Sequence, residues 1–452
     1  MSDTISIAVI GSGYVGLVSG ACFADLGYRV TCVDNDAARI AALNRGETPI
    51  YEPGLEELVA RGAAERKLSF TTDMAQAVAA ADVVLVTVGT PPRSSDGFAD
   101  LSNVYDVARD IAAHIDGFTV IVLKSTVPVG TGDEVERIIR GENPHADFAV
   151  ASNPEFLREG AAIDDFNAPD RVVIGVGDLL ARDVLAAMYA PLKDRGTPVI
   201  FTERRAAELV KYATNAFLAL KLTFINEMAD LCERVGVDVL EVARGVGTDT
   251  RIGTKFLNPG PGFGGSCFPK DALALVKTAQ DSASPLRLIE TMLAINDVRR
   301  RAVARKVIDA LPNGVRGRRI AVLGITFKPE TDDIREAPAL SIIQALKDNG
   351  AYVSVYDPKG MEHGKAAVKH VDWADDPYDC CKGASAIVLV TEWSEFRALD
   401  FNRLGLLMQE RLVVDLRNLY RAEALADFGF RHVGIGRPQW RHRVAHLAEA
   451  AE

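Results

Sequence analysis

The chain has 452 residues, of which 48% are hydrophobic and 25% are charged, and its formal net charge is −11. A chain of this length is too long for one hydrophobic core, so we expect two or three domains. The acidic balance argues against nucleic acid as a partner, and no apolar run is long enough to span a membrane.

The first predicted elements make a dinucleotide-binding unit. A short buried strand, ISIAVI, leads into GSGYVG, and a helical run and a second strand that ends at Asp34 follow. In this spacing Gly11 allows a tight turn, Gly13 lets a pyrophosphate approach the backbone, and Gly16 lets the helix pack against the strand. A carboxylate at Asp34 bonds ribose hydroxyls and repels a 2′-phosphate, so we predict NAD rather than NADP as the cofactor. Arg39 lies either over the adenosine or on an exposed helix face.

Three further strands are predicted in this unit, and each ends in small polar residues. They lie within residues 81–91, 118–131 and 148–160. Ligands of open parallel sheets bind at the carboxyl edge of the strands, so Thr90, Thr126 and Glu155 are candidate site residues. The two threonines fit equally well as turn-forming hydroxyls.

Residues 202–236 predict one long helix, because they contain no proline and reach a glycine only at their end. With a second helix over about 285–310, they indicate a helical middle section and a dimer surface. Lys211 and Asn215 are four residues apart and share a helix face that is otherwise mostly apolar. Polar groups on a buried face need partners; the alternative is that both lie at a solvated helix edge.

The run GPGFGGSCFPKD, residues 260–271, places a single thiol, Cys267, behind four glycines. The helix start that follows and the nearby Lys270 both favour the thiolate, and a thiolate beside an oxidising cofactor can capture an aldehyde covalently. The alternative is a structural cysteine followed by Asp271 as a helix N-cap. No histidine lies between His145 and His363, so acid–base groups in this region must be Asp, Glu, Lys or water.

After about residue 315 the α/β pattern begins again. The segments RRIAVLG, AYVSVYDP, SAIVLVTEW and RLVVDLRN parallel four strand segments of the first unit. GITFKPETDDIRE replaces the glycine triplet, which argues against a second dinucleotide but leaves a nucleotide-type cleft with Lys328 and Arg335 at its mouth. We therefore predict an α/β fold of two Rossmann-like, doubly wound domains joined by a long central helix and a helical middle section. The expected domains are 1–200, which binds NAD; 201–312, which is helical, dimerises and carries the cysteine loop; and 313–452, the second Rossmann-like unit.

The six cysteines show neither metal-binding spacing nor a C-x-x-C pair, so we expect no metal site. The beginning of the chain, MSDTISIAVI, lacks the basic region of a signal peptide. A cytoplasmic location with reduced thiols is therefore expected.

The chain resembles the nucleotide-sugar 6-dehydrogenases over nearly its whole length. The motifs that carry the resemblance are GSGYVG, VGTP, KSTVPVGT, NPEFLREG, the Lys211/Asn215 helix, GFGGSCFPKD and GITFKPETDDIRE. Within the family, Phe263 and the Phe-Pro-Lys-Asp ending after Cys267 are similar to the UDP-glucose branch. This resemblance implies that the C6 alcohol of UDP-glucose is oxidised to the carboxylate of UDP-glucuronate. It also implies that two NAD and one water are used and that no aldehyde is released.

The resemblance also assigns chemistry to five residues. Cys267 is implied to be the nucleophile that adds to the C6 aldehyde and becomes a thioester when the second hydride leaves. Asp271 is implied to activate the water that hydrolyses this thioester and to take part in the first oxidation through that water. Lys211 and Asn215 are implied to stabilise charge on the C6 oxygen, and Glu155 to be a further acid–base or hydrolytic group.

Binding residues follow from the same resemblance. Contacts with NAD are implied for Gly11, Gly13, Tyr14, Val15, Gly16, Asp34, Arg39, Thr90, Thr126, Glu159, Lys270 and Arg335. Contacts with the nucleotide sugar are implied for Phe156, Leu157, Arg158, Lys211, Asn215, Arg251, Phe256, Leu257, Asn258, Pro259, Gly260, Phe263, Gly264, Lys328 and Arg417. Arg251 is implied to reach across a dimer, so a homodimer or larger homo-oligomer is expected. Arg158 departs from some relatives, which carry a small residue at this position.

Three other functions remain open from the sequence. A UDP-N-acetylmannosamine or GDP-mannose 6-dehydrogenase shares the same general chemistry. A two-electron β-hydroxyacid dehydrogenase shares the first unit and a helical middle, but would leave the second Rossmann-like unit without a role. A non-catalytic NAD-binding regulator would have no use for the Cys267 loop or the Lys211 helix.

Overall fold

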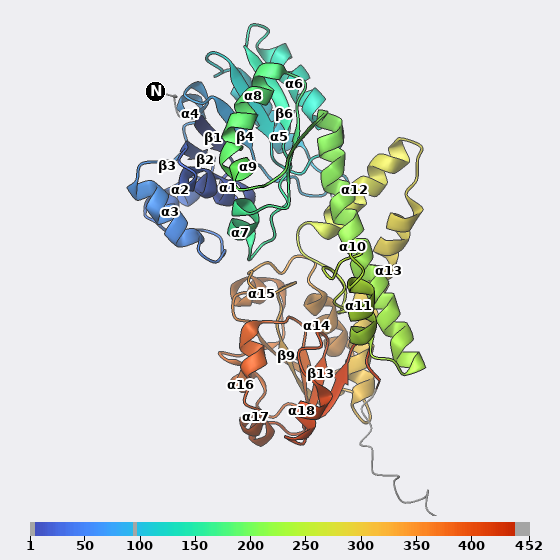
Figure 1. Ribbon diagram of the computed structural model, residues 1–452. Coiled ribbons are helices and arrows are strands. Elements are labelled where there is room, and N and C mark those ends of the chain that lie inside the picture. Colours follow the sequence, from blue (N-terminus) through green and yellow to red (C-terminus); the bar gives the residue numbers. More distant parts are fainter. Residues whose placement is uncertain (1–4, 94–96, 439–452) are drawn as a thin grey trace, which may run out of the picture. The chain divides into compact units, whose positions relative to one another are not determined.

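The computed structural model describes residues 5–93 and 97–438, which form two compact units (Figure 1). The first unit contains the described residues up to 216 together with 270–286, and the second contains 217–269 and the described residues from 287 onward. The predicted domain boundaries near residues 200 and 312 stay a prediction. The outer ends of the first and last predicted domains, residues 1–4 and 439–452, lie outside the described residues.

The first unit is built on an eight-stranded sheet. Its strands are β1 (Ser6–Ile10), β2 (Arg29–Val33), β3 (Leu68–Thr71), β4 (Val83–Val86), β5 (Thr119–Leu123), β6 (Phe148–Ser152), β7 (Val172–Gly175) and β8 (Val199–Thr202). They lie in the order β3-β2-β1-β4-β5-β6-β7-β8, and every neighbouring pair is parallel except β6 with β7. The first six positions have the strand order of dinucleotide-binding folds, whose ligand lies where the order reverses, here between β1 and β4.

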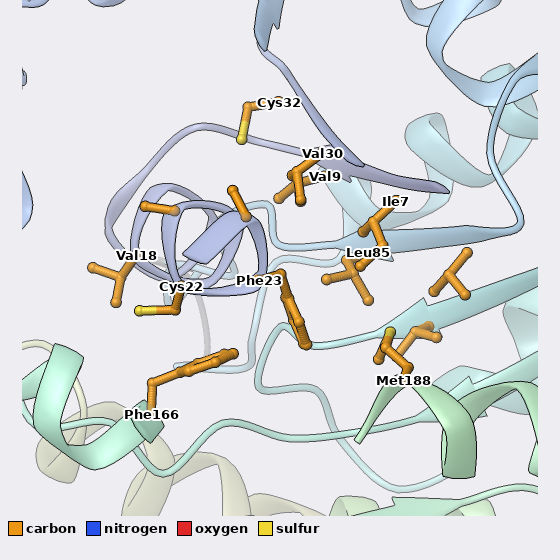
Figure 2. Close-up of a cluster of buried hydrophobic side chains, with 14 of the residues drawn as sticks. Ile7, Val9, Val18, Cys22, Phe23, Val30, Cys32, Leu85, Phe166 and Met188 are labelled. Carbon is orange, nitrogen blue, oxygen red and sulfur yellow. The ribbon is translucent and has the colours of Figure 1, made fainter. Parts of the chain in front are cut away.

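Helices cover both faces of this sheet, because side chains of successive strand residues point to opposite faces. Ile7 and Val9 of β1 belong to one buried cluster, whereas Ala8 and Ile10 belong to another. Figure 2 shows the first cluster, where Phe23 lies at the centre. The helices of this unit are α1 (Tyr14–Asp25), α2 (Ala37–Asn44), α3 (Leu55–Ala64), α4 (Met74–Ala79), α5 (Ser102–Ala112), α6 (Thr131–Glu142), α7 (Ala162–Asn167), α8 (Leu179–Met188) and α9 (Ala190–Asp194).

The second unit contains a six-stranded parallel sheet in the order β11-β10-β9-β12-β13-β14. Its strands are β9 (Arg319–Leu323), β10 (Tyr352–Tyr356), β11 (Asp372–Trp373), β12 (Ala386–Leu389), β13 (Leu412–Asp415) and β14 (Arg431–Gly434). Helices α14 (Pro338–Asp348), α15 (Met361–Ala367), α16 (Pro377–Cys380), α17 (Phe401–Leu407) and α18 (Ala422–Ala426), with the 3₁₀ turn η1 (Ser394–Ala398), connect them. This is the strand order of the first six strands of the other sheet, so the predicted repetition of a Rossmann-like unit is confirmed.

The carboxylate that follows β10 in the second unit is turned into the protein. Asp357 follows β10 as Asp34 follows β2, but it is only 1% exposed. Its carboxylate accepts hydrogen bonds from the backbone N–H groups of Ile325 and Gly360, both at 2.7 Å, and from the Trp393 indole at 3.2 Å. With its oxygens turned inward and Trp393 itself buried, Asp357 has no exposed oxygen to offer a ribose.

Four further helices complete the fold: α10 (Arg204–Val235), α11 (Val239–Gly247), α12 (Phe268–Asp281) and α13 (Arg287–Ala310). The predicted single helix over 202–236 is confirmed by α10, which is drawn as one long green helix in Figure 1. Helix α12 begins three residues before Asp271, which therefore lies in its first turn and is not its N-cap. Pro269 suits this early start, because proline is favoured in the first helical turn.

Candidate functional site

The glycine-rich turn after β1 has the geometry of a phosphate-binding loop. Gly11 has a φ of +101°, and the hydroxyl of Thr87 donates to the carbonyl oxygens of Ile10 and Gly11 at 2.9 and 2.8 Å. A Cβ atom on Gly16 would lie 1.8 Å from the Gly11 carbonyl oxygen, so only glycine fits there. A Cβ on Gly13 would meet no atom within 4 Å. The backbone at the start of α1 is therefore open to an anion.

Asp34 is connected directly to this loop. Its carboxylate accepts the Ser12 N–H at 2.7 Å, the Asp36 N–H at 3.0 Å and the Arg39 guanidinium at 3.0 Å. Burial opposes ionisation of Asp34, but the two N–H groups and Arg39 outweigh it and hold the pKa of this carboxyl below its ordinary value. Asp34 is thus an anion at neutral pH, and Arg39, whose side chain is 37% exposed, is its ion-pair partner.

A buried carboxylate that the sequence analysis missed links this turn to the NPEFLREG loop. Glu52 accepts the hydroxyl of Tyr14, the Gly160 N–H at 2.6 Å and the Ala162 N–H at 2.7 Å. Burial and Glu52 raise the pKa of Tyr14 above its ordinary value, and the Glu159 carboxylate also contributes. Tyr14 and Glu159, both predicted to contact NAD, are therefore close enough to interact.

The predicted residues at the carboxyl edge of the sheet are brought together. The Thr90 hydroxyl donates to the Thr126 carbonyl oxygen at 2.9 Å, which joins the ends of β4 and β5. Glu155 is buried, and its carboxylate accepts the Lys211 ammonium at 2.8 Å and the Leu157 N–H at 2.5 Å. Burial alone would raise the pKa of Glu155, but the Lys211 ammonium and then the Leu157 N–H hold that pKa below its ordinary value.

Phe156 and Arg158, on the same loop, have cationic and anionic partners. The Phe156 ring centroid lies 3.6 Å from the Arg171 guanidinium carbon and 5.3 Å from the Lys211 Nζ. Such cation–π contacts hold the ring in place; Arg171 was not anticipated from the sequence. The exposed Arg158 forms an ion pair with Asp165 at 2.6 Å.

Lys211 and Asn215 are 3% and 6% exposed, so neither lies at a solvated helix edge. The Asn215 amide donates to the Asp271 carboxylate at 2.7 Å, and the Lys270 ammonium lies 2.5 Å from the other oxygen of that carboxylate. Asp271 is 1% exposed. A buried carboxylate held by an amide and an ammonium group is suited to accept a proton from water or an alcohol.

In the second unit, Cys267 directly precedes α12. It is partly exposed, whereas the other five cysteines are buried, so it is not an inaccessible structural thiol. Its sulfur lies 3.5 Å from the Ser266 hydroxyl. The ring of Phe268, the next residue, packs against Phe256 and Phe263 with centroid separations of 5.9 and 6.1 Å.

Three polar side chains, again missed from the sequence, hold the loop before Cys267. Asn226 accepts the Gly260 N–H at 2.8 Å, and the Arg299 guanidinium donates to the Gly260 carbonyl oxygen at 2.8 Å. The Asn296 amide makes two hydrogen bonds with the Phe263 backbone, at 2.9 and 3.0 Å. All three side chains are buried. Their hydrogen bonds to the loop backbone take the place of those that a neighbouring strand would make. The loop is therefore held in place although it is not part of a sheet.

The GITFKP segment packs on the glycines of the same loop. Gly265 has a φ of +81°, and a Cβ there would lie 2.7 Å from the Phe327 ring, so this approach requires glycine. The Lys328 Nζ lies 5.6 Å from the Phe327 ring centroid. The Arg417 guanidinium donates to the Phe327 carbonyl oxygen at 3.0 Å, beside Gly260. These predicted nucleotide-sugar residues therefore gather around one loop.

Two predicted arginines are held by near neighbours in the chain. Arg251 is strongly exposed and pairs with Asp249 at 2.6 Å. Arg335, also exposed, pairs with Asp333 at 2.8 Å, while its carbonyl oxygen accepts the Gly265 N–H. Of the remaining predicted residues, Leu257, Pro259 and Gly264 are buried, Val15 is partly buried and Asn258 is exposed.

The open glycine-rich turn before α1 and the Asp34 carboxylate after β2 are typical of a dinucleotide-dependent protein. Buried Lys, Asn and Asp side chains and an accessible cysteine thiol, such as those described above, are typical of an enzyme. Models of the UDP-glucose/GDP-mannose dehydrogenase family match the chain in three parts: the NAD-binding domain at residues 5–193, the central domain at 205–298 and the UDP-binding domain at 321–422. The chain belongs to this family, and it is an NAD-dependent oxidoreductase.

Relatives and solved structures agree with this assignment. The chain is 60% identical to UDP-glucose 6-dehydrogenase of Rhizobium meliloti over 436 residues, which cover 96% of this chain and all of the relative. A UDP-glucose dehydrogenase of Pyrobaculum islandicum has a TM-score of 0.89 at 39% identity, covering 96% of this chain and 98% of the other. A UDP-D-ManNAc dehydrogenase of Pyrococcus horikoshii has a TM-score of 0.83 at 28% identity, with coverages of 96% and 100%.

Two further findings concern the described part of the chain. None of its helices is both long and apolar enough to cross a membrane. Residues 5–93 and 97–438 contain no group of three or more His, Cys, Asp or Glu side chains that could hold a metal ion.

Asp34 should set the choice between NAD and NADP. We expect roughly 10- to 100-fold higher kcat/KM with NAD, the effect of one or two lost interactions at about 1.4 kcal/mol per tenfold. In Asp34→Ser the repulsion is removed and Arg39 is released to meet a 2′-phosphate, so the preference should shrink at least tenfold. Steady-state kinetics with both cofactors check this, with Asp36→Ser as the control. An unchanged ratio in Asp34→Ser would show that this carboxylate does not face the adenosine ribose.

Proposed function

We propose that the protein oxidises UDP-glucose to UDP-glucuronate in two successive NAD-dependent steps at Cys267. The observation that carries this proposal is an accessible thiol directly before a helix whose first turn holds the buried Asp271. The 60% identical relative named UDP-glucose 6-dehydrogenase supports UDP-glucose as the substrate, and the match to the family's UDP-binding domain supports the uridine nucleotide.

The first step removes a hydride and a proton from the C6 alcohol. The glycine-rich turn and Asp34 would hold NAD, which would supply the hydride acceptor, and Asp271 accepts the hydroxyl proton through a water molecule. Lys211 and Asn215 donate hydrogen bonds to the C6 oxygen as negative charge develops on it. Their burial makes these donors effective, because competing water is excluded.

The second step begins when the Cys267 thiolate adds to the C6 aldehyde. The thiohemiacetal that forms gives its hydride to a second NAD and becomes a thioester, so the aldehyde is never free. Water activated by Asp271 attacks the thioester carbonyl, the thiolate leaves, and UDP-glucuronate is released. Glu155 holds the Lys211 ammonium in place throughout. Each oxidation yields one NADH and one proton, and hydrolysis yields a third proton.

The stoichiometry tests this proposal. We expect two NADH for each UDP-glucose consumed and no aldehyde that a carbonyl reagent can trap, because the intermediate stays covalently bound. UDP-N-acetylmannosamine and GDP-mannose serve as matched substrates in the same assay and should be oxidised far more slowly. A ratio of one NADH, as a two-electron dehydrogenase would give, or efficient oxidation of either alternative sugar nucleotide, would overturn the proposal.

The proposal extends to a homodimer and to the expected cytoplasmic location. In the second unit, Phe217 and Phe224 of α10 and Leu288 of α13 are 63%, 48% and 71% exposed, and they line an apolar hollow of ≈ 470 Å³. Contiguous exposed apolar surface of this kind is typical of protein interfaces, and a second copy of the chain is the partner that the central helices suggest. Sedimentation of a particle of 48.7 kDa, the mass of one chain, would contradict a dimer.

A further inference from the structure

A second buried lysine, Lys124, interacts electrostatically with both members of the Glu155–Lys211 ion pair and has no role in the chemistry described so far. Lys124 follows β5 directly and is 5% exposed. Its Nζ donates to the Asn153 side-chain oxygen at 3.1 Å and to the Tyr189 hydroxyl at 3.5 Å. Both acceptors are neutral, so the structure buries an amine without a hydrogen-bonded carboxylate.

The hydrogen bonds around Lys124 fix the direction of each donor. The Asn153 amide nitrogen donates to the Val173 carbonyl oxygen at 2.8 Å, which turns the amide oxygen toward Lys124. The Tyr189 hydroxyl donates to this same oxygen at 2.5 Å, which leaves a hydroxyl lone pair for the lysine. The Asn153 oxygen and the Tyr189 hydroxyl are enough to accept from both N–H groups of a neutral Lys124 amine. An ammonium group has a third N–H group that also needs an acceptor.

The charges that act on Lys124 come from the catalytic side chains. Glu155 favours its ammonium form, and the Lys211 ammonium opposes it. With all three groups ionised, the buried cluster of Lys124, Lys211 and Glu155 carries a net charge of +1, and it becomes neutral when Lys124 loses its proton. Burial of one excess charge is costly, so a proton on Lys124 acts against the proton on Lys211.

We propose that Lys124 is a positioning residue of this reaction: its buried amine, held by Asn153 and Tyr189, gains and loses one proton and thereby sets the net charge of the cluster of Lys124, Lys211 and Glu155. The inference rests on the proposed function, because Lys211 is the group that it assists. Burial lowers the pKa of Lys124 to about 8 from its ordinary value of 10.5, which agrees with the geometry.

Stability provides a test that does not depend on activity. Below about pH 8 both the folded and the unfolded chain keep the Lys124 proton, and the folded state bears the full cost of the buried charge. Between about 8 and 10.5 the folded state has released a proton that the unfolded state retains, so the stability of the wild-type protein rises with pH in this window. The Tm of the wild type should therefore rise relative to that of Lys124→Met between pH 8 and 10. Parallel Tm curves would overturn the proposal.

Kinetics test the effect on Lys211. In the wild type, kcat for UDP-glucose oxidation should show an ionisation between pH 7 and 9, and in Lys124→Met and Lys124→Gln this ionisation should be lost. At pH 7.5 kcat of both variants should differ from the wild-type value, while KM for NAD changes less than about threefold. Lys193→Met, at an exposed position on α9, is the control.

The two replacements separate charge from hydrogen bonding and protect the test against misfolding. Glutamine still donates to Asn153, whereas methionine matches the lysine in size without donating. The same pH profile in both variants supports a role of the charge, and a wild-type ionisation that persists in either folded variant contradicts it. If UDP-glucose proves not to be the substrate, the Tm measurement still reports on Lys124, so the two proposals fail separately.

Discussion

Replacing the thiol of Cys267 by a hydroxyl should stop the reaction after the sugar has become attached to the enzyme. An ester on the new serine has a far poorer leaving group than a thioester, because an alkoxide is much more basic than a thiolate. We therefore expect Cys267→Ser to accumulate a covalent adduct and to lose steady-state turnover by orders of magnitude. Intact-mass measurement after incubation with UDP-glucose and NAD detects the adduct.

Cys267→Ala removes covalent capture but keeps Lys211, Asn215 and Asp271. This variant should interconvert the alcohol and the aldehyde with one equivalent of cofactor, and it should form no acid and no adduct. Cys232→Ala, which removes a buried thiol elsewhere, should keep both oxidations per folded molecule. If Cys267→Ala makes UDP-glucuronate at a near-normal rate, the thiol is structural and the proposed mechanism is wrong.

The second large effect is expected at Asp271. Asp271→Asn keeps the size of the side chain but removes its charge and its ability to accept a proton from water, while one of Asn215 and Lys270 loses its acceptor oxygen. General-base catalysis contributes about 10²- to 10⁴-fold, so we expect kcat to fall within this range. Binding of NAD, measured by titration, should change little, because the glycine-rich turn is untouched.

A matched variant exists on the same helix. Asp281, at the other end of α12, is exposed and pairs with Lys277 at 3.1 Å. Asp281→Asn should leave kcat unchanged, since exposed ion pairs contribute at most about 1 kcal/mol to stability. Comparing the Tm values of both variants shows whether folding has been affected. A kcat of Asp271→Asn within about threefold of wild type would exclude Asp271 as the base.

The main architecture was predictable because its signals are local. The glycine triplet and the acid at the end of the second strand lie within 24 residues, and GSGYVG has an open turn in the structure, as expected. The long helix over 202–236 was found because nothing in its sequence interrupts it. In contrast, the strands β3, β7 and β8 were missed, although they are as long as β4, which was predicted.

Single polar residues whose partners lie far away in the chain were also missed. Glu52 is 108 residues from Gly160, and Arg299 is 69 residues from Asp230. No spacing pattern in the sequence predicts such pairs. Only the folded structure shows that these side chains are buried and hydrogen-bonded. The structure also resolved one alternative that the sequence left open, because it buries Lys211 and Asn215. The catalytic and binding roles of the predicted residues stay predictions.

The inward-facing carboxylate of Asp357, bonded to the buried Trp393, has a consequence for the timing of the proposed reaction. In the proposed mechanism, the glycine-rich turn after β1 must bind the cofactor twice, once for each of the two hydrides. The first NADH must leave and a second NAD must enter while the half-oxidised sugar stays behind. The residence time of the sugar therefore has to exceed that of the cofactor, and a covalent bond to sulfur provides this without requiring tight binding of either the substrate or the product.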